Sequence, residues 1–265
     1  MRRNYARALL GAAAIAALGV SAGTANAQLQ DKTIRFATQS ISPGLGLPEF
    51  GGASPAVYSL YPIYDSMTQI SEKGDIVGML AESWKNLDAT TWHVTLKKGI
   101  KFHNGEEVTA DAVVTLFNWL LTPEAKGMGL VAERTNTNQL KAVSVAQVDP
   151  YTVEFKTATP NPEFPRFAAS FWIPAPKAWR DQGRESFSRN PIGTGPYQVV
   201  AYDGGVDGTI RLDAFSGAGV RAPKYAHLTI VALADAAARV SGLESDQLDI
   251  AQGVSFDAKT QLEAS

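Results

Sequence analysis

Residues 81–121 carry the most regular hydrophobic pattern in the chain, and its first part predicts a strand followed by a turn. Apolar and polar side chains alternate over residues 91–97, as expected for a strand with one face in a core. Ile100 and Phe102 resume the alternation after a bend. The segment then reaches His103-Asn104-Gly105, where glycine tolerates the positive φ of a tight turn. We therefore expect the chain to reverse at this turn.

The second part of the same segment predicts an amphipathic helix. Its apolar residues recur at three- to four-residue spacing, which places them on one buried face: Val113, Leu116, Phe117, Leu120 and Leu121. Thr109 is a suitable N-cap, and Asp111 lies near the positive end of the helix dipole. Thr122-Pro123 should end the helix.

Shorter apolar or alternating runs elsewhere predict more strands than helices. Strands are expected at residues 33–38, 69–80 (a hairpin), 140–148, 151–156, 197–201, 202–213 (a hairpin around Gly204-Gly205) and 226–233. A helix or helical turn is expected at residues 56–67, and a helix at 234–243. Residues 122–138 are polar, which favours a surface excursion.

The first 27 residues have the composition of an export signal. Arg2, Arg3 and Arg7 precede a short apolar run over residues 8–20, and Ala25-Asn26-Ala27 forms a small-residue cleavage site before Gln28. The run is shorter than the roughly 20 apolar residues that a membrane-spanning helix needs. The residues after Arg3 do not follow the twin-arginine pattern, and no cysteine stands at the cleavage point for a lipid anchor. We expect a protein released into a Gram-negative periplasm.

Removal of this segment changes the charge balance. The full chain has 24 basic and 26 acidic residues, and losing three arginines moves the net charge from −2 to 21 − 26 = −5. A mildly acidic chain without a basic cluster has no electrostatic footprint for nucleic acid or for an anionic membrane. With no cysteine, stability must come from core packing.

Residues suited to catalysis or metal binding are scattered through the sequence. The three histidines, His93, His103 and His227, lack metal-ligand spacing, and there is no thiol nucleophile and no G-x-S-x-G motif. Glu106-Glu107 follows a glycine turn, where a solvated position is favoured. We therefore expect no enzyme activity, no metal and no cofactor. A secreted hydrolase with a dispersed active site remains the enzyme alternative.

The order of residues in the 81–121 segment resembles the signature of the family 5 extracellular solute-binding proteins. The resemblance rests on Ala81, Asp88, Thr91-Trp92, Val94, Leu96 to Phe102, His103-Asn104-Gly105 and Thr109-Ala110-Asp111. Gly193-Thr194-Gly195-Pro196-Tyr197 is similar to a second family element, and residues 242–251 are similar to a third. The 193–197 element is not a phosphate loop, because it lacks G-x-G-x-x-G and Pro196 has no N–H to donate.

This resemblance implies a fold as well as a role. Family members capture peptides and related solutes for ABC importers, between α/β lobes that hinge shut. The implied fold is periplasmic-binding-protein-like, of type II and cluster C-like, with mixed sheets. Residues 28–60 and 169–265 would form a first, discontinuous and incomplete lobe, and 61–168 an inserted smaller lobe.

Family members are roughly twice as long as this chain. The second, ligand-closing lobe, which in peptide-binding members carries the carboxylate that holds the peptide's amino terminus, has no counterpart here. The sequence leaves two alternatives open, a fragment of a longer protein or a truncated, decayed product that binds no solute.

The resemblance also suggests where a ligand would lie. In the family, the loop after the first strand borders the pocket, and here that loop is glycine-rich, which makes Phe50, Gly51 and Gly52 candidate contacts, with an ordinary connector as the alternative. Tyr61 and Trp172 are candidate pocket aromatics, although either is also a plausible core residue. We expect a monomeric periplasmic receptor that takes up a small solute, peptide by base rate, and delivers it to an inner-membrane ABC permease.

Overall fold

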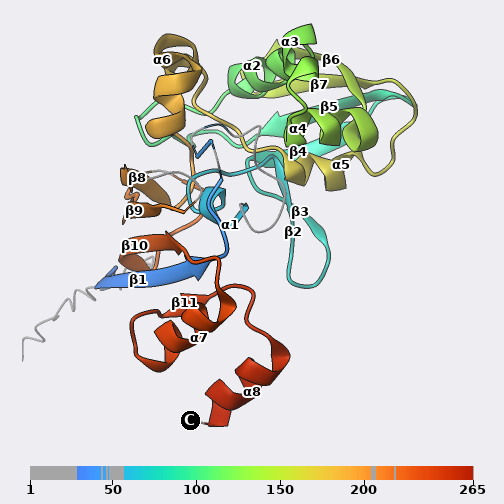
Figure 1. Cartoon of the computed structure of the whole chain (residues 1–265). Coiled ribbons are helices and arrows are strands. Elements are labelled where there is room, and N and C mark those ends of the chain that lie inside the picture. Colours follow the sequence, from blue (N-terminus) through green and yellow to red (C-terminus); the bar gives the residue numbers. More distant parts are fainter. Residues whose placement is uncertain are drawn as a thin grey trace, which may run out of the picture.

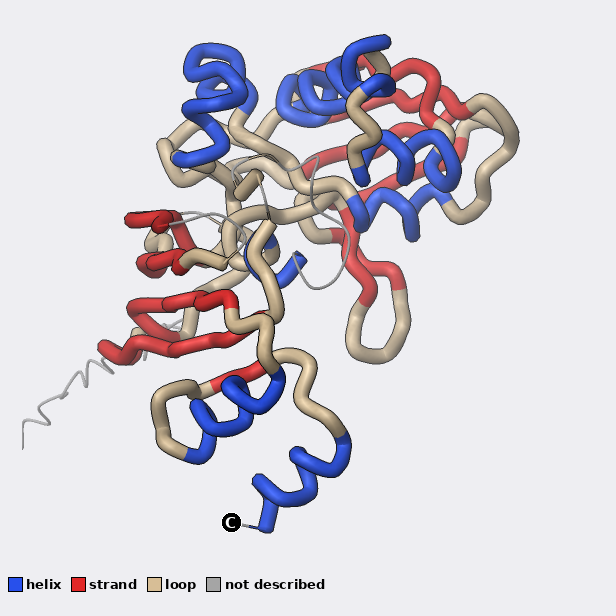
Figure 2. The backbone as a smooth tube through the Cα atoms, in the orientation of Figure 1, coloured by secondary structure: helices blue, strands red, loops and turns tan. Residues whose placement is uncertain are grey.

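The computed structural model describes residues 29–42, 44–45, 47, 57–203, 207–217 and 219–264. The expected export signal, the Gly204-Gly205 hairpin tip and the loop candidates Phe50, Gly51 and Gly52 lie outside these residues. Two sheets and a short hairpin organise the described chain, with helices placed around them (Figures 1 and 2).

The larger sheet has five strands in the order β11-β1-β10-β9-β8. Its strands are β1 (Gln30–Thr38), β8 (Tyr197–Asp203), β9 (Thr209–Ala214), β10 (Tyr225–Ala232) and β11 (Ile250–Ala251). β1 runs parallel to β10 and β11, whereas β9 is antiparallel to both β8 and β10. The sheet is therefore mixed, and it joins the first described residues to a segment nearly 200 positions later.

The smaller sheet has four antiparallel strands in the order β4-β5-β7-β6. Its strands are β4 (Ala81–Asn86), β5 (Thr91–Leu96), β6 (Ala142–Asp149) and β7 (Thr152–Thr157). Helix α2 (Ala110–Leu120) buries its apolar face here, and the rings of Phe117 and Phe155 meet edge to face at 5.1 Å. Hairpin β2 (Thr68–Ile70) and β3 (Ile76–Gly78) leads into this sheet and projects from it (Figure 1).

The remaining helical segments are short or peripheral. They are α1 (Val57–Leu60), α3 (Pro123–Gly127), α4 (Val131–Thr135), a π-helical turn (Asn136–Leu140), α5 (Phe164–Phe167), a 3₁₀ turn (Ala168–Ser170), α6 (Pro176–Arg189), α7 (Ala236–Glu244) and α8 (Phe256–Ala264). In Figure 1, α2 to α5 gather around the smaller sheet, and α7 and α8 lie beyond β11.

Most expected elements are confirmed within one to three residues, with some corrections. Of the helix or helical turn expected at 56–67, the structure has the turn alone, because α1 ends at Leu60 and the chain then turns through Pro62. Thr109 stands at the N-cap of α2 but makes no side-chain capping bond. The polar stretch 122–138 holds α3 and α4, and Thr122 both follows α2 and caps α3 by accepting a bond from the Ala125 N–H.

The strands divide between the two sheets in the same way as the two lobes expected from the sequence. The four strands of the smaller sheet fall within residues 61–168, and the five strands of the larger sheet fall outside that range. The boundaries of two separate lobes stay a prediction.

Candidate functional site

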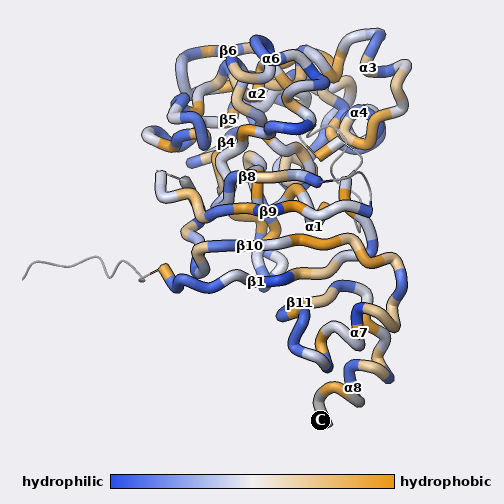
Figure 3. The backbone as a smooth tube through the Cα atoms, turned by 60° about the vertical axis from the view of Figure 1, so that its left-hand side comes forward, coloured by the Kyte–Doolittle hydropathy of each residue, from blue (hydrophilic) through white to orange (hydrophobic). Residues whose placement is uncertain are grey.

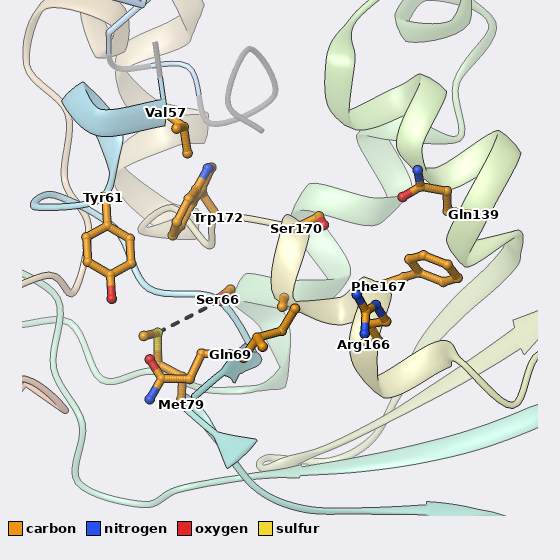
Figure 4. Close-up of a pocket in the computed structure, with 12 residues that line it drawn as sticks. Val57, Tyr61, Ser66, Gln69, Met79, Gln139, Arg166, Phe167, Ser170 and Trp172 are labelled. Atoms are coloured by element: carbon orange, nitrogen blue, oxygen red, sulfur yellow. Dashed lines mark hydrogen bonds between the residues drawn. The ribbon is translucent and has the colours of Figure 1, made fainter. Parts of the chain in front are cut away.

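A cavity of about 430 Å³ opens where α1, hairpin β2–β3 and the α5–3₁₀ segment meet (Figure 4). Its lining mixes aromatic, aliphatic and polar side chains: Val57, Tyr61, Ser66, Gln69, Ile70, Met79, Gln139, Arg166, Phe167, Ala169, Ser170 and Trp172. In Figure 4, Tyr61 and Trp172 stand on one side of the cavity, with Phe167 and Gln139 across from them. Apolar walls with a few polar groups are typical of small-molecule sites.

Backbone pairing brings the two aromatic candidates together. Ser66 and Trp172 form an isolated antiparallel bridge, and the Ile173 N–H donates to the Asp65 carbonyl at 3.0 Å. The Tyr61 and Trp172 rings then meet nearly edge to face, with centroids 5.9 Å apart. The structure thus places both residues on one cavity wall, although they are 111 positions apart.

The sequence left open whether these aromatics belong to the core. Tyr64 is fully buried, whereas Tyr61 stays 45% exposed on the cavity side. Trp172 is only 6% exposed and still lines the cavity. Trp172 therefore serves as a core residue and as a wall of the cavity.

Arg221 holds Tyr61 in position through contacts with its backbone and its ring. Its Nε donates to Asp65 Oδ1 at 2.7 Å, and its Nη2 donates to the carbonyls of Tyr61 and Tyr64 at 2.6 and 2.9 Å. The guanidinium also lies 4.2 Å from the centroid of the Tyr61 ring, within the range of a cation–π contact. Asp65 is fully buried and accepts a second bond, 2.9 Å long, from Thr194 Oγ1. A buried carboxylate with these donors holds the cavity wall in one position.

Sequence reasoning singled out neither Asp65 nor Arg221. The two residues lie 156 positions apart, so no local pattern joins them. A charged residue directly after buried Tyr64 was the available signal.

The two glycines of the 193–197 element have a structural explanation. A Cβ on Gly193 would lie 2.1 Å from the Ile63 carbonyl oxygen, and one on Gly195 would lie 2.3 Å from that of Pro62. The Gly195 N–H donates to Ile63 O at 2.8 Å. This element therefore packs directly against the Pro62-Ile63 segment that follows Tyr61, and only glycine permits so close a backbone approach.

His103, from the expected turn, also packs against this element. Its Nε2 lies 2.9 Å from the Gly195 carbonyl, and its Nδ1 accepts from the Gly193 N–H at 3.4 Å. The neutral ring with hydrogen on Nε2 satisfies both contacts. Burial lowers the pKa of His103, against smaller opposing effects of the Gly195 bond and Asp65. His103 does not line the cavity, so its arrangement is that of a structural residue.

Within the described residues, no group of three or more His, Asp or Glu side chains is placed to hold a metal ion. In the same part of the chain, no helix has the length and apolar character needed to cross a membrane.

Another cavity, of about 660 Å³, lies against the larger sheet beside α7. Its acidic residue Asp249 is already engaged, by Lys32 at 3.3 Å and by Arg35 at 3.0 Å. The cavity at Tyr61 has the better combination of aromatic walls and unengaged polar groups, so we take it as the candidate site.

Comparison with known proteins links the fold to a family. A model described as "Bacterial extracellular solute-binding proteins, family 5 Middle" matches residues 75–265. The Oligopeptide-binding protein AppA of Bacillus subtilis (strain 168) is 31% identical over 206 residues, covering 75% of this chain and 36% of that protein. The Dipeptide-binding protein of Escherichia coli (strain K12) is 27% identical over 252 residues, covering 88% of this chain and 47% of that protein.

A solved structure agrees with these matches. The binding protein MoaA from A. tumefaciens R10, in complex with mannopinic acid, superimposes with a TM-score of 0.71 at 25% identity, covering 84% of this chain and 45% of that one. The chain thus spans about half the length, or less, of the relatives it matches. The expected α/β fold with mixed sheets, of the cluster C binding-protein type, is confirmed. The chain belongs to the bacterial extracellular solute-binding proteins of family 5.

Proposed function

We propose that this chain is the solute-binding component of an ABC importer, which captures a peptide or a related small solute and delivers it to an inner-membrane permease. The cavity beside Tyr61 and Trp172 carries this proposal, since it combines aromatic walls with neutral hydrogen-bonding groups. Relatives named for oligopeptide and dipeptide binding support the choice of peptide. The composition of residues 1–27 supports export to the periplasm.

Capture in this proposal involves no covalent step. The rings of Tyr61 and Trp172 offer apolar contact area to the solute, and the amides of Gln69 and Gln139 offer hydrogen bonds. The contacts of Arg221 with the ring and the carbonyl of Tyr61 hold Tyr61 in place before the solute binds, which lowers the entropy cost of binding. The family is one of non-catalytic transport proteins, which agrees with the sequence-based expectation that the chain is not an enzyme.

Closure by a further lobe is part of the proposal and concerns the whole-length protein. In the two-lobe mechanism, solute held on one lobe is enclosed when the other rotates onto it. The loop candidates Phe50, Gly51 and Gly52, together with Tyr61 and Trp172, would then contact the solute.

Calorimetric titration of the purified chain with mixed short peptides tests the proposal. We expect saturable heat with a stoichiometry of one, and a loss of affinity of about ten-fold or more in Trp172→Leu, because a large aromatic contact is removed. Trp84→Leu is the matched control, since Trp84 lies on β4 and does not line the cavity. Absence of heat with every peptide would favour the decayed product, and turnover of a peptide or ester would revive the hydrolase.

A further inference from the structure

The charge of the cavity lining is one-sided. Of the side chains that line it in the described part of the chain, Arg166 alone carries a full charge, and neither Asp nor Glu is among them. Arg166 is exposed at the cavity rim, on the short helix α5 (Figure 4). An arginine keeps its charge at any physiological pH, so this rim is permanently positive.

Most polar side chains of the cavity lining, other than Ser66, are also unengaged. Among the described residues, the Arg166 guanidinium has no ion pair and no hydrogen-bond acceptor, and the side chains of Gln69, Gln139 and Ser170 have no partner either. The Trp172 indole N–H is buried and lacks an acceptor, and in Figure 4 its nitrogen points toward Val57, another lining residue. A buried donor without an acceptor is destabilising, and a ligand oxygen placed against it relieves that cost.

Two of these unengaged groups, the Arg166 guanidinium and the Trp172 indole, can only donate hydrogen bonds. A guanidinium offers five N–H groups and an indole offers one, whereas the two amides and the hydroxyls of Tyr61 and Ser170 can both donate and accept. The Ser66 hydroxyl already donates to the Thr68 carbonyl at 2.6 Å, so its hydrogen is not available to a solute, although its oxygen can still accept. An ammonium group would meet a like charge and no carboxylate, whereas a carboxylate fits the guanidinium fork.

We propose that Arg166 binds a carboxylate group of the solute, with the adjoining apolar part of the solute against Phe167, Tyr61 and Trp172. This inference rests on the proposed solute capture and makes it more specific. It assigns the acidic end of the solute to the described cavity and leaves the amino end to groups outside it. Arg166 is then a specificity-determining residue that sequence reasoning did not identify.

Blocking one end of a peptide at a time tests this assignment. The probe is a short peptide without acidic or basic side chains, titrated in three forms: with both ends free, with an amidated carboxyl end and with an acetylated amino end. We expect amidation to weaken binding to the unmodified chain about ten-fold and acetylation to change it less than two-fold. Because Arg166 is exposed, the effect of amidation should shrink in high salt.

Substitution of Arg166 supplies the second arm. In Arg166→Gln, the free and the amidated peptide should bind within two-fold of each other, and Arg166→Lys should restore part of the difference. Arg211→Gln, which removes an exposed arginine on β9 away from the cavity, should bind all three forms like the unmodified chain.

The failures are distinguishable. If the unmodified chain binds none of the peptides that the calorimetric panel contains, the proposed function fails and the inference fails with it. If the unmodified chain binds the free and the amidated peptide with equal affinity, the proposed function stands and the role of Arg166 is wrong. The same holds if Arg166→Gln still prefers the free peptide as strongly as the unmodified chain does.

Discussion

The two sheets of this protein are buried to very different degrees. In β5 and β7 of the smaller sheet the inward-facing side chains are fully buried, and α2 covers them. In β10 of the larger sheet, seven of eight residues are only half-buried. Figure 3 shows that β9 and β10 nevertheless carry strongly hydrophobic segments. The larger sheet is thus not short of hydrophobic residues, but the described chain leaves more of them only partly covered.

This difference separates the elements that stabilise the described chain from those that leave surface available. The aromatic cluster of the smaller sheet, with Trp92 stacked on Phe164 at 5.2 Å and Phe155 against Phe164 at 5.0 Å, is complete within residues 57–203. The larger sheet contributes fewer fully buried positions, among them Ile210 and Ile230. The junction at Asp65 and Gly195 connects the two regions, and the candidate site is beside that junction.

Truncation of Phe155 should have the largest effect of the four changes below. Phe155→Ala removes a fully buried ring that contacts Phe117 and Phe164, and we expect a loss of about 3–5 kcal/mol in the free energy of unfolding. The matched change in the larger sheet, Leu228→Ala on half-buried β10, should cost about 1 kcal/mol. Urea denaturation followed by circular dichroism measures both. Equal costs would mean that the two regions do not differ as described.

Removal of the buried carboxylate at the junction should come next. Asp65→Ala leaves Arg221 without its counterion, and we expect a cost of about 3 kcal/mol, at the lower end for a buried pair because Arg221 is partly exposed. Asp65→Asn keeps an acceptor for Thr194 and should cost less. Denaturation measures the stability, and peptide titration should show weaker binding as Tyr61 loses its support. If Asp65→Ala were as stable as the unmodified chain, the Asp65–Arg221 pair would not stabilise the junction between the two sheets.

Addition of one methyl group at the junction should have a smaller effect. Gly195→Ala places a Cβ within 2.6 Å of backbone atoms of Pro62 and Ile63, so the backbone must shift, at a cost of about 1–3 kcal/mol. Gly127→Ala, in α3 with open space around the new methyl, is the control and should be neutral or slightly stabilising. Thermal unfolding compares the two. Equal melting temperatures would show that the close approach is unimportant.

The pH dependence of the unfolding free energy should report the lowered pKa of His103 in the folded state. Burial lowers its pKa in the folded state below the value of about 6.5 expected for the unfolded chain. As the pH falls from 7 to 5 the unfolded state binds a proton that the folded state does not, so stability decreases, by at most about 1.4 kcal/mol per pH unit.

The change His103→Gln isolates this contribution. Denaturation at several pH values should show a flatter profile for the variant than for the unmodified chain. Parallel profiles would mean that His103 does not titrate differently in the two states.

The sequence predicted elements well where a local pattern determines them. The alternation at residues 91–97 and the apolar spacing from Val113 to Leu121 correspond to β5 and α2, because each pattern expresses one buried face. Helix α6 was missed, since it is largely polar and interrupted at Gly183, whose φ is +71°. Helix α1 was overextended, because apolar composition alone does not show where a chain turns.

The site was only partly predictable, for a different reason. Tyr61 and Trp172 were named as candidates, but their contact depends on the pairing of Ser66 with Trp172 across more than 100 residues. Arg221 and Arg166 reach the site through the tertiary structure alone: the Arg221 guanidinium stacks on Tyr61, and Arg166 lines the cavity. No periodicity or motif marks such residues before the fold is known.

Hydrogen–deuterium exchange with and without a bound peptide tests the central claim, that solute binds at the Tyr61–Trp172 cavity, most directly. We expect slower exchange with peptide in residues 57–70 and 166–173, and unchanged exchange in β10 and α7. Protection confined to the larger sheet around Tyr225 and Asp249, or no protection despite measurable binding, would contradict the claim and place the solute elsewhere.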